Sequence, residues 1–341
     1  MQAYQIVPGK HLEGLSRIPV RAGSLGPNDV RIAVRAVSLN FRDLMISHAT
    51  YPVSGDKPPV PCSDGAGEVI AVGPQVTRFR AGDRVMASFF PNWIEGDPTP
   101  QKTKGALGAD VDGMLSQEVV FHEDALARVP AHLSYNEAAT LPCAAVTAWN
   151  ALFITGALKP GNTVLLQGTG GVSIFALQLA KAAGLQTIIT SSSDAKLERA
   201  KTLGANATIN YRSTPEWQDK VVELTDGRGV DLVVDVGGQD TVKRSAAAVR
   251  MGGTVCIIGG LSGFSGTADA IALIVGAKRL AGIYVGSRTM LEGVSQFVSH
   301  SAIRPIIDRV FRFEQAREAY AHLESGNHFG KVVIEVGSPS G

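Results

Sequence analysis

The chain has 341 residues, more than one hydrophobic core usually serves, so its length predicts two domains. Apolar residues make up 45 % of the chain and charged residues 18 %, and 32 basic side chains almost balance 31 acidic ones. This balance implies no strongly basic face, so we expect neither a nucleic acid nor a membrane surface as a partner.

The cysteines Cys62, Cys143 and Cys256 lie far apart, and their spacing indicates no disulfide framework. The first eleven residues lack the charged-then-apolar layout of a signal peptide. No apolar run approaches the ~20 residues that span a bilayer. We therefore expect a soluble protein of the cytoplasm.

Short runs of β-forming residues, broken by Gly and Pro, fill the chain up to about residue 125. Examples are residues 30–39, 67–73 and 83–89, with GPND and AGD as turns between them. This pattern predicts an antiparallel, barrel-like β domain. Residues 91–113 have no clear period and are predicted as a long loop, and loops of that length are usually functional or mobile.

From about residue 160 apolar runs alternate with helical segments such as 172–184 and 194–204. The predicted strands are 163–167, 186–191, 207–211, 230–236, 254–260 and 279–286. This alternation predicts a doubly wound parallel sheet of the α/β class. The tail, with a helix at 313–326 and a strand at 331–336, is expected to rejoin the first domain. The catalytic β domain is placed at 1–130 and 290–341, and the dinucleotide-binding Rossmann domain at 131–289.

A glycine-rich loop, GTGGVS, follows the first strand of this second domain and leads into a helix. Gly168 suits a tight turn, and a missing side chain at Gly170 lets a pyrophosphate approach the backbone. The position between strand and helix favours dinucleotide binding over a structural turn. The predicted contacts of the loop are Gly168, Thr169, Gly170, Gly171 and Val172.

The second strand ends TSSSDAK, which bears on the choice of dinucleotide. Hydroxyls at Ser191 and Ser192 and the cation of Lys196 suit a 2′-phosphate better than a carboxylate would, so NADP is favoured over NAD. Asp194, or Ser193, is a natural N-cap for the next helix. Lys196 has the alternative of an ordinary exposed helix lysine.

Five motifs together resemble the medium-chain dehydrogenase/reductase superfamily. They are SLNFRD (38–43), PCSDGAGEVIAVG (61–73), GDRV (82–85), LPCAAVTAWNAL (141–152) and QGTGGVS (167–173). The resemblance covers essentially the whole chain and implies a GroES-like β domain followed by a Rossmann domain. Within the superfamily the chain resembles the zinc-independent, quinone oxidoreductase-like branch.

The resemblance also implies contacts with NADPH. Ser192, Lys196 and Tyr211 match the positions that embrace the 2′-phosphate, although Tyr211 has the alternative of a plain strand end. Thr147 resembles the residue that abuts the nicotinamide, and Lys331, in NHFGK, is expected near the cofactor. Room for ribose and nicotinamide is expected at Gly237, Gly259, Leu261 and Val285, after the later strands. Pairing through 279–286 would make a homodimer, which this family commonly forms.

In the zinc enzymes of the superfamily, the catalytic metal takes a cysteine, a histidine and a second cysteine, with a glutamate nearby. Here those positions carry Asn40, Ser63 and Cys143, with Asp64 at the glutamate position, and 91–113 contains no cysteine for a structural zinc. We therefore predict no zinc, because neutral amides and hydroxyls are poor zinc ligands. The alternative is a weak site of Cys143, Asp64 and a histidine such as His48. Cys62 and Cys143 are expected to pack as small buried hydrophobes.

Without a metal, negative charge on the acceptor oxygen must be met by hydrogen-bond donors. The Asn40 amide is the predicted donor, with a loop-capping amide as its alternative. Tyr51 could donate a proton or line the pocket, and Trp93 could line it or anchor the 91–113 loop. An Arg42–Asp43 ion pair is expected to hold the Asn40 loop.

The predicted function is NADPH-dependent reduction of quinones or α,β-unsaturated carbonyls, in which conjugation spreads the developing charge. Two alternatives stay open. One is an NAD(P)-dependent alcohol dehydrogenase acting on alcohols or aldehydes. The other is an NADPH-binding structural or sensor protein without turnover.

Overall fold

The computed structural model describes residues 1–21, 23–54, 57–263 and 270–337. They form two compact units, Met1–Val146 with Gly286–Gly341, and Thr147–Val285. The segment 131–146, which the sequence pattern groups with the Rossmann domain, packs in the first unit. Its helix α3 (Tyr135–Ala138) lies against three strands of that unit, β3 (Asp29–Leu39), β4 (Asp64–Val72) and β15 (Lys331–Glu335).

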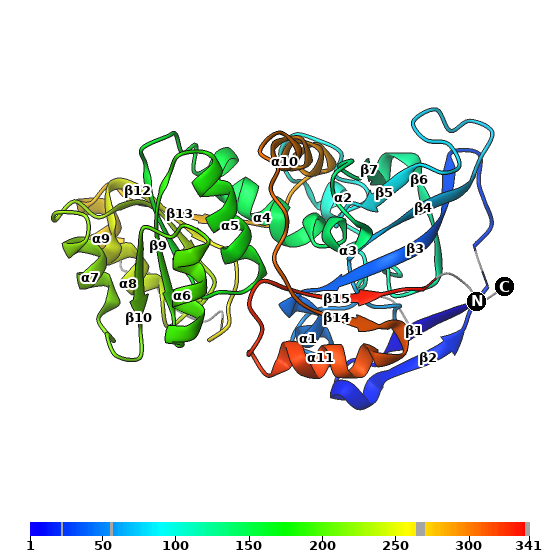
Figure 1. Ribbon diagram of the computed structural model, residues 1–341, viewed down its shortest axis with the longest axis horizontal. Coiled ribbons are helices and arrows are strands. Elements are labelled where there is room, and N and C mark those ends of the chain that lie inside the picture. Colours follow the sequence, from blue (N-terminus) through cyan, green and yellow to red (C-terminus); the bar gives the residue numbers. More distant parts are fainter. Residues whose placement is uncertain (22, 55–56, 264–269, 338–341) are drawn as a thin grey trace. The chain divides into compact units, whose positions relative to one another are not determined.

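The first unit is built on a mostly antiparallel sheet with the order β14-β15-β3-β4-β5-β7, and β6 also pairs with β3 (Figure 1). The strands of this unit are β1 (Gln2–Ile6), β2 (Leu15–Pro19), β3 (Asp29–Leu39), β4 (Asp64–Val72), β5 (Arg84–Ala87), β6 (Glu118–His122), β7 (Leu126–Arg128), β14 (Ile307–Arg312) and β15 (Lys331–Glu335). β1 and β2 form a separate antiparallel pair. The predicted antiparallel β domain is thus confirmed.

The C-terminal tail rejoins this sheet, as predicted. β15 pairs antiparallel with β3, so that Val332 stands opposite Leu39. The helices of the unit are α1 (Phe41–Ser47), α2 (Pro100–Thr103), α3, α10 (Arg288–His300) and α11 (Ala316–Glu324), with the short 3₁₀-helices η1 (His11–Gly14), η2 (Glu123–Ala125) and η5 (Phe313–Gln315) and the π-helix η3 (Leu141–Ala145). Val332 and Ile334 of β15 are fully buried together with Ile32 and Val34 of β3, so the tail completes the hydrophobic core.

The second unit is a six-stranded sheet with the order β10-β9-β8-β11-β12-β13, and every pairing is parallel. Its strands are β8 (Thr163–Gln167), β9 (Gln186–Ser191), β10 (Ala207–Asn210), β11 (Val230–Asp235), β12 (Val249–Ile257) and β13 (Arg279–Gly282). Its helices are α4 (Val146–Trp149), which begins at the unit boundary, η4 (Asn150–Thr155), α5 (Gly171–Ala182), α6 (Asp194–Thr202), α7 (Trp217–Glu223), α8 (Val242–Ala248) and α9 (Ala270–Val275). This order is that of the predicted doubly wound fold.

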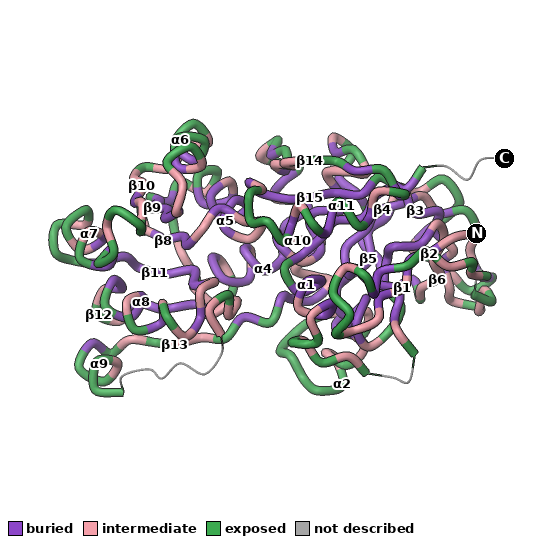
Figure 2. Tube along the Cα trace, turned by 90° about the horizontal axis from the view of Figure 1, so that it is seen from below, coloured by how far each residue is buried: buried purple, intermediate pink, exposed green. Residues whose placement is uncertain are grey.

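Helices cover both faces of this parallel sheet. Figure 2 shows α5 and α6 on one face and α8 on the other, and β8 and β11 between them are drawn as buried. Leu165 of β8, Val233 of β11 and Val255 of β12 are fully buried. Burial on both faces explains why these strands are nearly continuous apolar runs in the sequence.

One helical run, Tyr135–Thr155, is long and apolar enough to cross a membrane by length and composition, with a mean hydropathy of 1.4 in its most apolar window. The sequence pattern predicts no such run, because the polar Glu137, Thr140 and Asn150 interrupt it. Within the window 72 % is buried inside the protein, as is usual for a core helix.

Candidate functional site

Asn40 lies between β3 and α1, and its side chain is directed by a buried lysine. Asn40 N–H donates to Asp43 Oδ2 (2.8 Å), so Asp43 supplies a side-chain hydrogen bond of the capping box at the start of α1. The amide Oδ1 accepts from Lys331 Nζ at 2.6 Å. Because an ammonium can only donate, this contact identifies the facing atom as the oxygen and turns the amide NH₂ away from Lys331.

The NH₂ group of Asn40 is a buried donor whose hydrogen bonding is incomplete. Asn40 is only 9 % exposed, and its Nδ2 makes no hydrogen bond of standard geometry to any residue that the structure describes. Hydrogen bonding by the Asn40 side chain, through a contact outside standard geometry, lowers the pKa of the Asp64 carboxyl. Leaving a buried donor with incomplete hydrogen bonding costs up to about 1–3 kcal/mol, part of which is regained when a better acceptor binds.

Asp64, the first residue of β4, is completely buried beside this amide. Its Oδ1 accepts from Ser63 Oγ (2.7 Å), and its Oδ2 accepts from the backbone N–H of Cys143 (3.0 Å). Burial raises the pKa of Asp64, and the charge of Lys331 opposes that rise. Burial and the neighbouring Asp64 also raise the pKa of the Cys143 thiol to about 12. The structure therefore brings together all four positions that correspond to the zinc site of the superfamily.

Lys331, predicted near the cofactor, is enclosed in this cluster. It is 3 % exposed, and its Nζ donates to Leu39 O and to Asn40 Oδ1, both at 2.6 Å. β15 begins at Lys331 and runs beside β3, which places the ammonium at the end of β3. Its contacts make Lys331 a positioning residue for Asn40.

The expected ion pair between Arg42 and Asp43 is not formed. Arg42 donates to Leu107 O, and its guanidinium lies over the rings of Phe89 (4.4 Å) and Tyr51 (5.4 Å). No nitrogen of Arg42 is hydrogen-bonded to Asp43, whose Oδ2 accepts from Asn40 N–H at the start of α1. Burial raises the pKa of Asp43 to about 6, although Arg42 lowers it in part.

The segment 91–113 folds back onto Cys62. Met114 N–H donates to Cys62 O (2.8 Å), and a Cβ at Gly108, whose φ is +75°, would lie 2.7 Å from Cys62 N. Gly108 therefore allows both the turn and the close approach. Cys62 is fully buried, with its Sγ 3.5 Å from the hydroxyl of Tyr320, so it packs as the sequence predicts.

Trp93 and Tyr51 take different places in the first unit. Trp93 is 2 % exposed and its Nε1 donates to Gly96 O, so it anchors the 91–113 loop. Tyr51 is half-buried and lines an open cavity of about 360 Å³. The other lining residues are Pro8, Ala49, Val53, Lys57, Pro58 and Pro59. Of the two predicted roles of Tyr51, lining a pocket is therefore one that it can have in this cavity.

His48 does not lie with Cys143 and Asp64, so the alternative metal site built on these three residues is wrong. Among the described residues, the only group of three His, Cys, Asp or Glu side chains whose ligand atoms lie within 4.8 Å of one another joins His48 to His11 and Glu324. His48 Nε2 lies 2.9 Å from Glu324 Oε1.

The glycine-rich loop of the second unit has the predicted strand-turn-helix geometry. Gly168 has a φ of +72°, which favours glycine, and Gly170 is the N-cap of α5. Ser173 Oγ donates to Gln167 O (2.6 Å), so the serine ties the helix to the end of β8. The free N–H groups at the start of α5, from Gly171 onward, suit an anion, with Thr169 and Val172 beside them.

The residues predicted to discriminate the 2′-phosphate gather at the ends of β9 and β10. Tyr211 N–H donates to Ser191 O (3.1 Å), and the Tyr211 side chain is 42 % exposed. Ser193 caps α6 by accepting from Lys196 N (3.4 Å), which places Lys196 and Ser192 at the same edge. The Asp194 carboxylate accepts from Asn210 Nδ2 (2.7 Å), so it has a structural partner.

Asp235 organises the glycine turn after β11, and sequence reasoning missed it. Its Oδ1 accepts from the N–H groups of Gly237 (3.1 Å) and Gly238 (3.0 Å), and its Oδ2 accepts from Ser245 Oγ (2.5 Å). The signal was available, because an aspartate closes an otherwise apolar strand. This carboxylate holds the turn at the carboxyl edge of the sheet, where ligands of such folds bind.

The remaining predicted cofactor residues lie at or near that edge. Gly259 follows β12, and a Cβ there would lie 3.0 Å from Val236 O. Leu261 is exposed, and Thr147 is buried in α4. Val285, beyond β13, has a φ of +52°, a strained conformation for a β-branched residue, and its carbonyl accepts from Asn150 Nδ2 (2.8 Å).

Comparison with known proteins identifies the family. The description "Alcohol dehydrogenase GroES-like domain" matches residues 26–131, and "Zinc-binding dehydrogenase" matches residues 171–300. A zinc-type alcohol dehydrogenase-like protein of Schizosaccharomyces pombe is 44 % identical over 319 residues, which cover 92 % of each chain. The chain belongs to the medium-chain dehydrogenase/reductase superfamily. It therefore combines a GroES-like domain with a Rossmann domain and is an NAD(P)H-dependent oxidoreductase.

Other members of the superfamily show its range of substrates. A quinone oxidoreductase of Pseudomonas aeruginosa is 33 % identical over 319 residues, 91 % of each chain. The solved structure of an NAD-dependent alcohol dehydrogenase is 32 % identical, with a TM-score of 0.89 and coverage of 99 % and 100 %. That of the 2-octenoyl-CoA carboxylase reductase CinF, in complex with NADP and 2-octenoyl-CoA, is 25 % identical, with a TM-score of 0.88 and coverage of 99 % and 88 %.

Proposed function

We propose that this protein is an NADPH-dependent, zinc-independent reductase of α,β-unsaturated carbonyls or quinones. The observation that carries the proposal is the buried amide of Asn40, whose oxygen is held by Lys331 and whose NH₂ makes no hydrogen bond of standard geometry to the described residues. Such a group is a ready donor for an oxygen that gains negative charge.

The residues at the zinc position do not fit a zinc ion. Catalytic zinc takes three cysteine, histidine or carboxylate ligands, and here only Cys143 and Asp64 are of those types. Both Asp64 oxygens already accept hydrogen bonds, and Asn40 Oδ1 is taken by Lys331. The ammonium of Lys331 would also repel a dication in the same buried cluster. No step of the proposed reaction therefore runs through zinc.

The chain's own residues supply the rest of the mechanism. Nicotinamide, when bound, supplies the hydride. The Asn40 NH₂ donates to the acceptor's oxygen as charge develops there, which is worth about 3–4 kcal/mol for a preorganised donor. Lys331 fixes the direction of that donor, and Asp64 stays bound to Ser63 and to the Cys143 backbone.

The preference for NADPH over NADH rests on the edge formed by β9 and β10. Ser192, Lys196 and Tyr211 lie there, and the nearby Asp194 is paired with Asn210. A cation with hydroxyl groups suits the 2′-phosphate, whereas a free carboxylate would suit the 2′-hydroxyl of NADH.

The acceptor class rests on the chemistry of Asn40 and on two relatives. An amide is a weaker electrophile than a metal ion, so it suits acceptors whose conjugation spreads the charge. The CinF structure contains an enoyl thioester with NADP, and the P. aeruginosa relative is a quinone oxidoreductase. The alternative, an alcohol dehydrogenase, is favoured by the zinc-type relative of S. pombe and by the retained Cys143.

We also propose a cytoplasmic homodimer. β13 is an edge strand of the parallel sheet, and a second copy could extend that sheet across a two-fold axis. Exposed apolar side chains lie on the neighbouring α9, at Ile271, Ile274 and Val275. The molar mass in light scattering, measured for the protein and for Ile274→Lys, tests the dimer, because the substitution should yield monomer.

The function is tested by following NADPH oxidation by chelator-treated protein with a small quinone, a short enone and an aldehyde, and NADH in parallel. We expect turnover of the quinone or the enone, faster with NADPH, and no gain on adding Zn²⁺. Activity confined to the aldehyde and restored by Zn²⁺ would refute the proposal and favour the alcohol dehydrogenase.

A further inference from the structure

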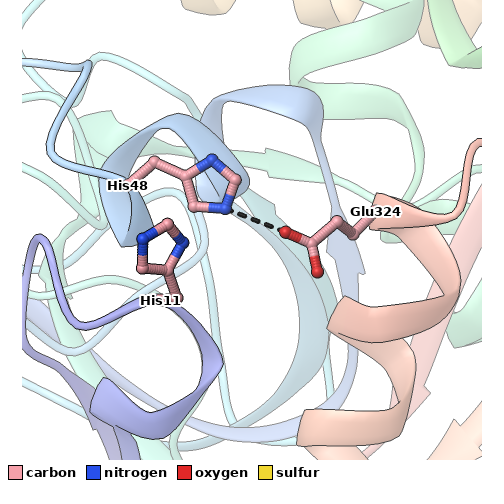
Figure 3. A group of neighbouring side chains, drawn as sticks. All are labelled: His11, His48 and Glu324. Atoms are coloured by element: carbon pink, nitrogen blue, oxygen red, sulfur yellow. Dashed lines mark hydrogen bonds and ion pairs between the residues drawn. The ribbon is translucent and has the colours of Figure 1, made fainter.

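Two imidazoles and a carboxylate meet on the surface of the first unit. Figure 3 shows His11, His48 and Glu324 directed toward one another from three separate segments. One ligand atom from each lies within 4.8 Å of the other two. The His11 and His48 ring centroids are 4.4 Å apart, and His48 Nε2 lies 2.9 Å from Glu324 Oε1.

The backbone holds these segments together independently of the three side chains. Gly9 N–H donates to Ser47 O (2.9 Å), which fixes the chain before η1 against the end of α1. His11 itself has a φ of +49°, an uncommon conformation for a residue other than glycine. His11 is therefore held beside His48 by the fold, and strained backbone of this kind persists only where the surroundings impose it.

The electrostatics at this point favour a cation. Glu324 is the last residue of α11, where the helix dipole disfavours negative charge. His48 is the C-cap of α1, so carbonyl groups at the ends of both helices lie near the cluster. A cation between these ends would compensate both the carboxylate and the helix termini.

We infer that His11, His48 and Glu324 form a binding site for a divalent transition-metal ion of the Zn²⁺ or Co²⁺ type. Imidazole nitrogen and carboxylate oxygen are the ligands such ions take, and three protein ligands leave one position for water. Around a tetrahedral ion with bonds of ~2.1 Å, the ligand atoms stand roughly 3.4 Å apart. His11 and Glu324 are exposed and His48 is half-buried, so small side-chain rotations reach that geometry.

The bound ion would join segments that are remote in the sequence. His48 and Glu324 are 276 residues apart, and His11 belongs to a third segment. Binding by the native fold alone stabilises that fold by mass action. This site is separate from the position discussed for catalytic zinc, and its ligand set contains no thiolate.

The experiment titrates tag-free, chelator-treated protein with Co²⁺, whose visible spectrum reports coordination number and thiolate ligands, and measures the melting temperature with Zn²⁺. The test variants are His48→Gln and Glu324→Gln. The matched control is His300→Gln, which removes an exposed histidine outside the cluster. Metal-free circular dichroism of each variant confirms its fold.

We expect one equivalent of Co²⁺ to give a four- or five-coordinate spectrum without a thiolate charge-transfer band. Zn²⁺ at a hundredfold excess over its Kd should raise the melting temperature by about 5 °C. Both test variants should weaken binding by roughly tenfold or more, and His300→Gln should not. No saturable binding, binding unaffected by either test variant, or a thiolate band that Cys143→Ser abolishes would overturn the inference.

Discussion

Replacing Asn40 by aspartate separates the observed contact of its amide oxygen with Lys331 from the proposed donor role of its NH₂. In the native protein, Lys331 Nζ donates to the Asn40 oxygen at 2.6 Å. The variant keeps an oxygen at this position, so the positioning contact should survive. It loses the NH₂, the group proposed to donate to the acceptor's oxygen. It also places a carboxylate next to that oxygen.

The size of the effect follows from the loss of one preorganised donor in a buried site. Removing such a donor costs about 3–4 kcal/mol of transition-state stabilisation, and each 1.36 kcal/mol corresponds to a factor of ten. Asn40→Asp should therefore lower kcat with an enone by roughly 10²–10³-fold. The Kd of NADPH should change little, because Asn40 is not among the predicted NADPH contacts and because Lys331, which is one of them, keeps an oxygen partner at position 40.

The assay measures kcat and KM for the enone at pH 8, where the new carboxylate is ionised, and the Kd of NADPH by nicotinamide fluorescence. Circular dichroism and the melting temperature establish that the variant is folded. A folded Asn40→Asp protein that keeps more than about a third of the wild-type kcat would refute the donor role of Asn40.

Three further predictions concern other parts of the molecule. Lys331→Met should lower kcat by roughly tenfold with little change in KM, because the Asn40 amide loses its orienting cation. A fall in kcat accompanied by an equally large rise in KM would instead indicate general disruption of the site. Lys196→Ala should weaken NADPH binding by at least about tenfold and leave NADH binding unchanged. Lys201→Ala is the control for loss of an exposed lysine. Equal losses of affinity for NADPH and NADH would contradict a contact between Lys196 and the 2′-phosphate. Asp231 has a 2 % exposed side chain, and although burial raises its pKa, bonds from two arginines and the Thr163 N–H bring that pKa down to about 2. The stabilising effect of the ionised Asp231 is present above the unfolded pKa of 3.8 and is lost as the pH falls through about 2. Asp231→Asn should therefore lower the free energy of unfolding by about 2 kcal/mol at pH 7 and by progressively less toward pH 2. Urea unfolding at each pH measures this free energy.

The order of the strands and helices in the second unit could largely be predicted from the sequence. β8 and β9 lie at the predicted residues, and the glycine loop lies between β8 and α5. Apolar period and glycine turns are local properties, and the strand-helix alternation needs nothing else to be recognised. The ends of the strands were predicted less well. β12 begins at Val249 and not at residue 254, because it continues through Gly252 and Gly253, a pair that is typical of a turn.

The side-chain arrangement of the site was predicted only in part. The sequence shows that Asn40 and Ser63 stand where metal ligands would be, but not what their neighbours are. Asp43 caps α1 instead of pairing with Arg42, since the start of a helix offers free N–H groups close to it. Arg42 then stacks on aromatic rings that lie elsewhere in the chain.

The sequence by itself determined the two kinds of domain and the phosphate loop, because apolar periods and glycine turns depend on residues close together in the chain. Only the tertiary structure decided what surrounds Asn40 and His48. Lys331 is 291 residues from Asn40, and Glu324 is 276 residues from His48. The first contact exists because β15 pairs with β3, and the second because α1 and α11 pack together. Such pairings are set by the burial of whole elements in a common core, and no local pattern encodes them.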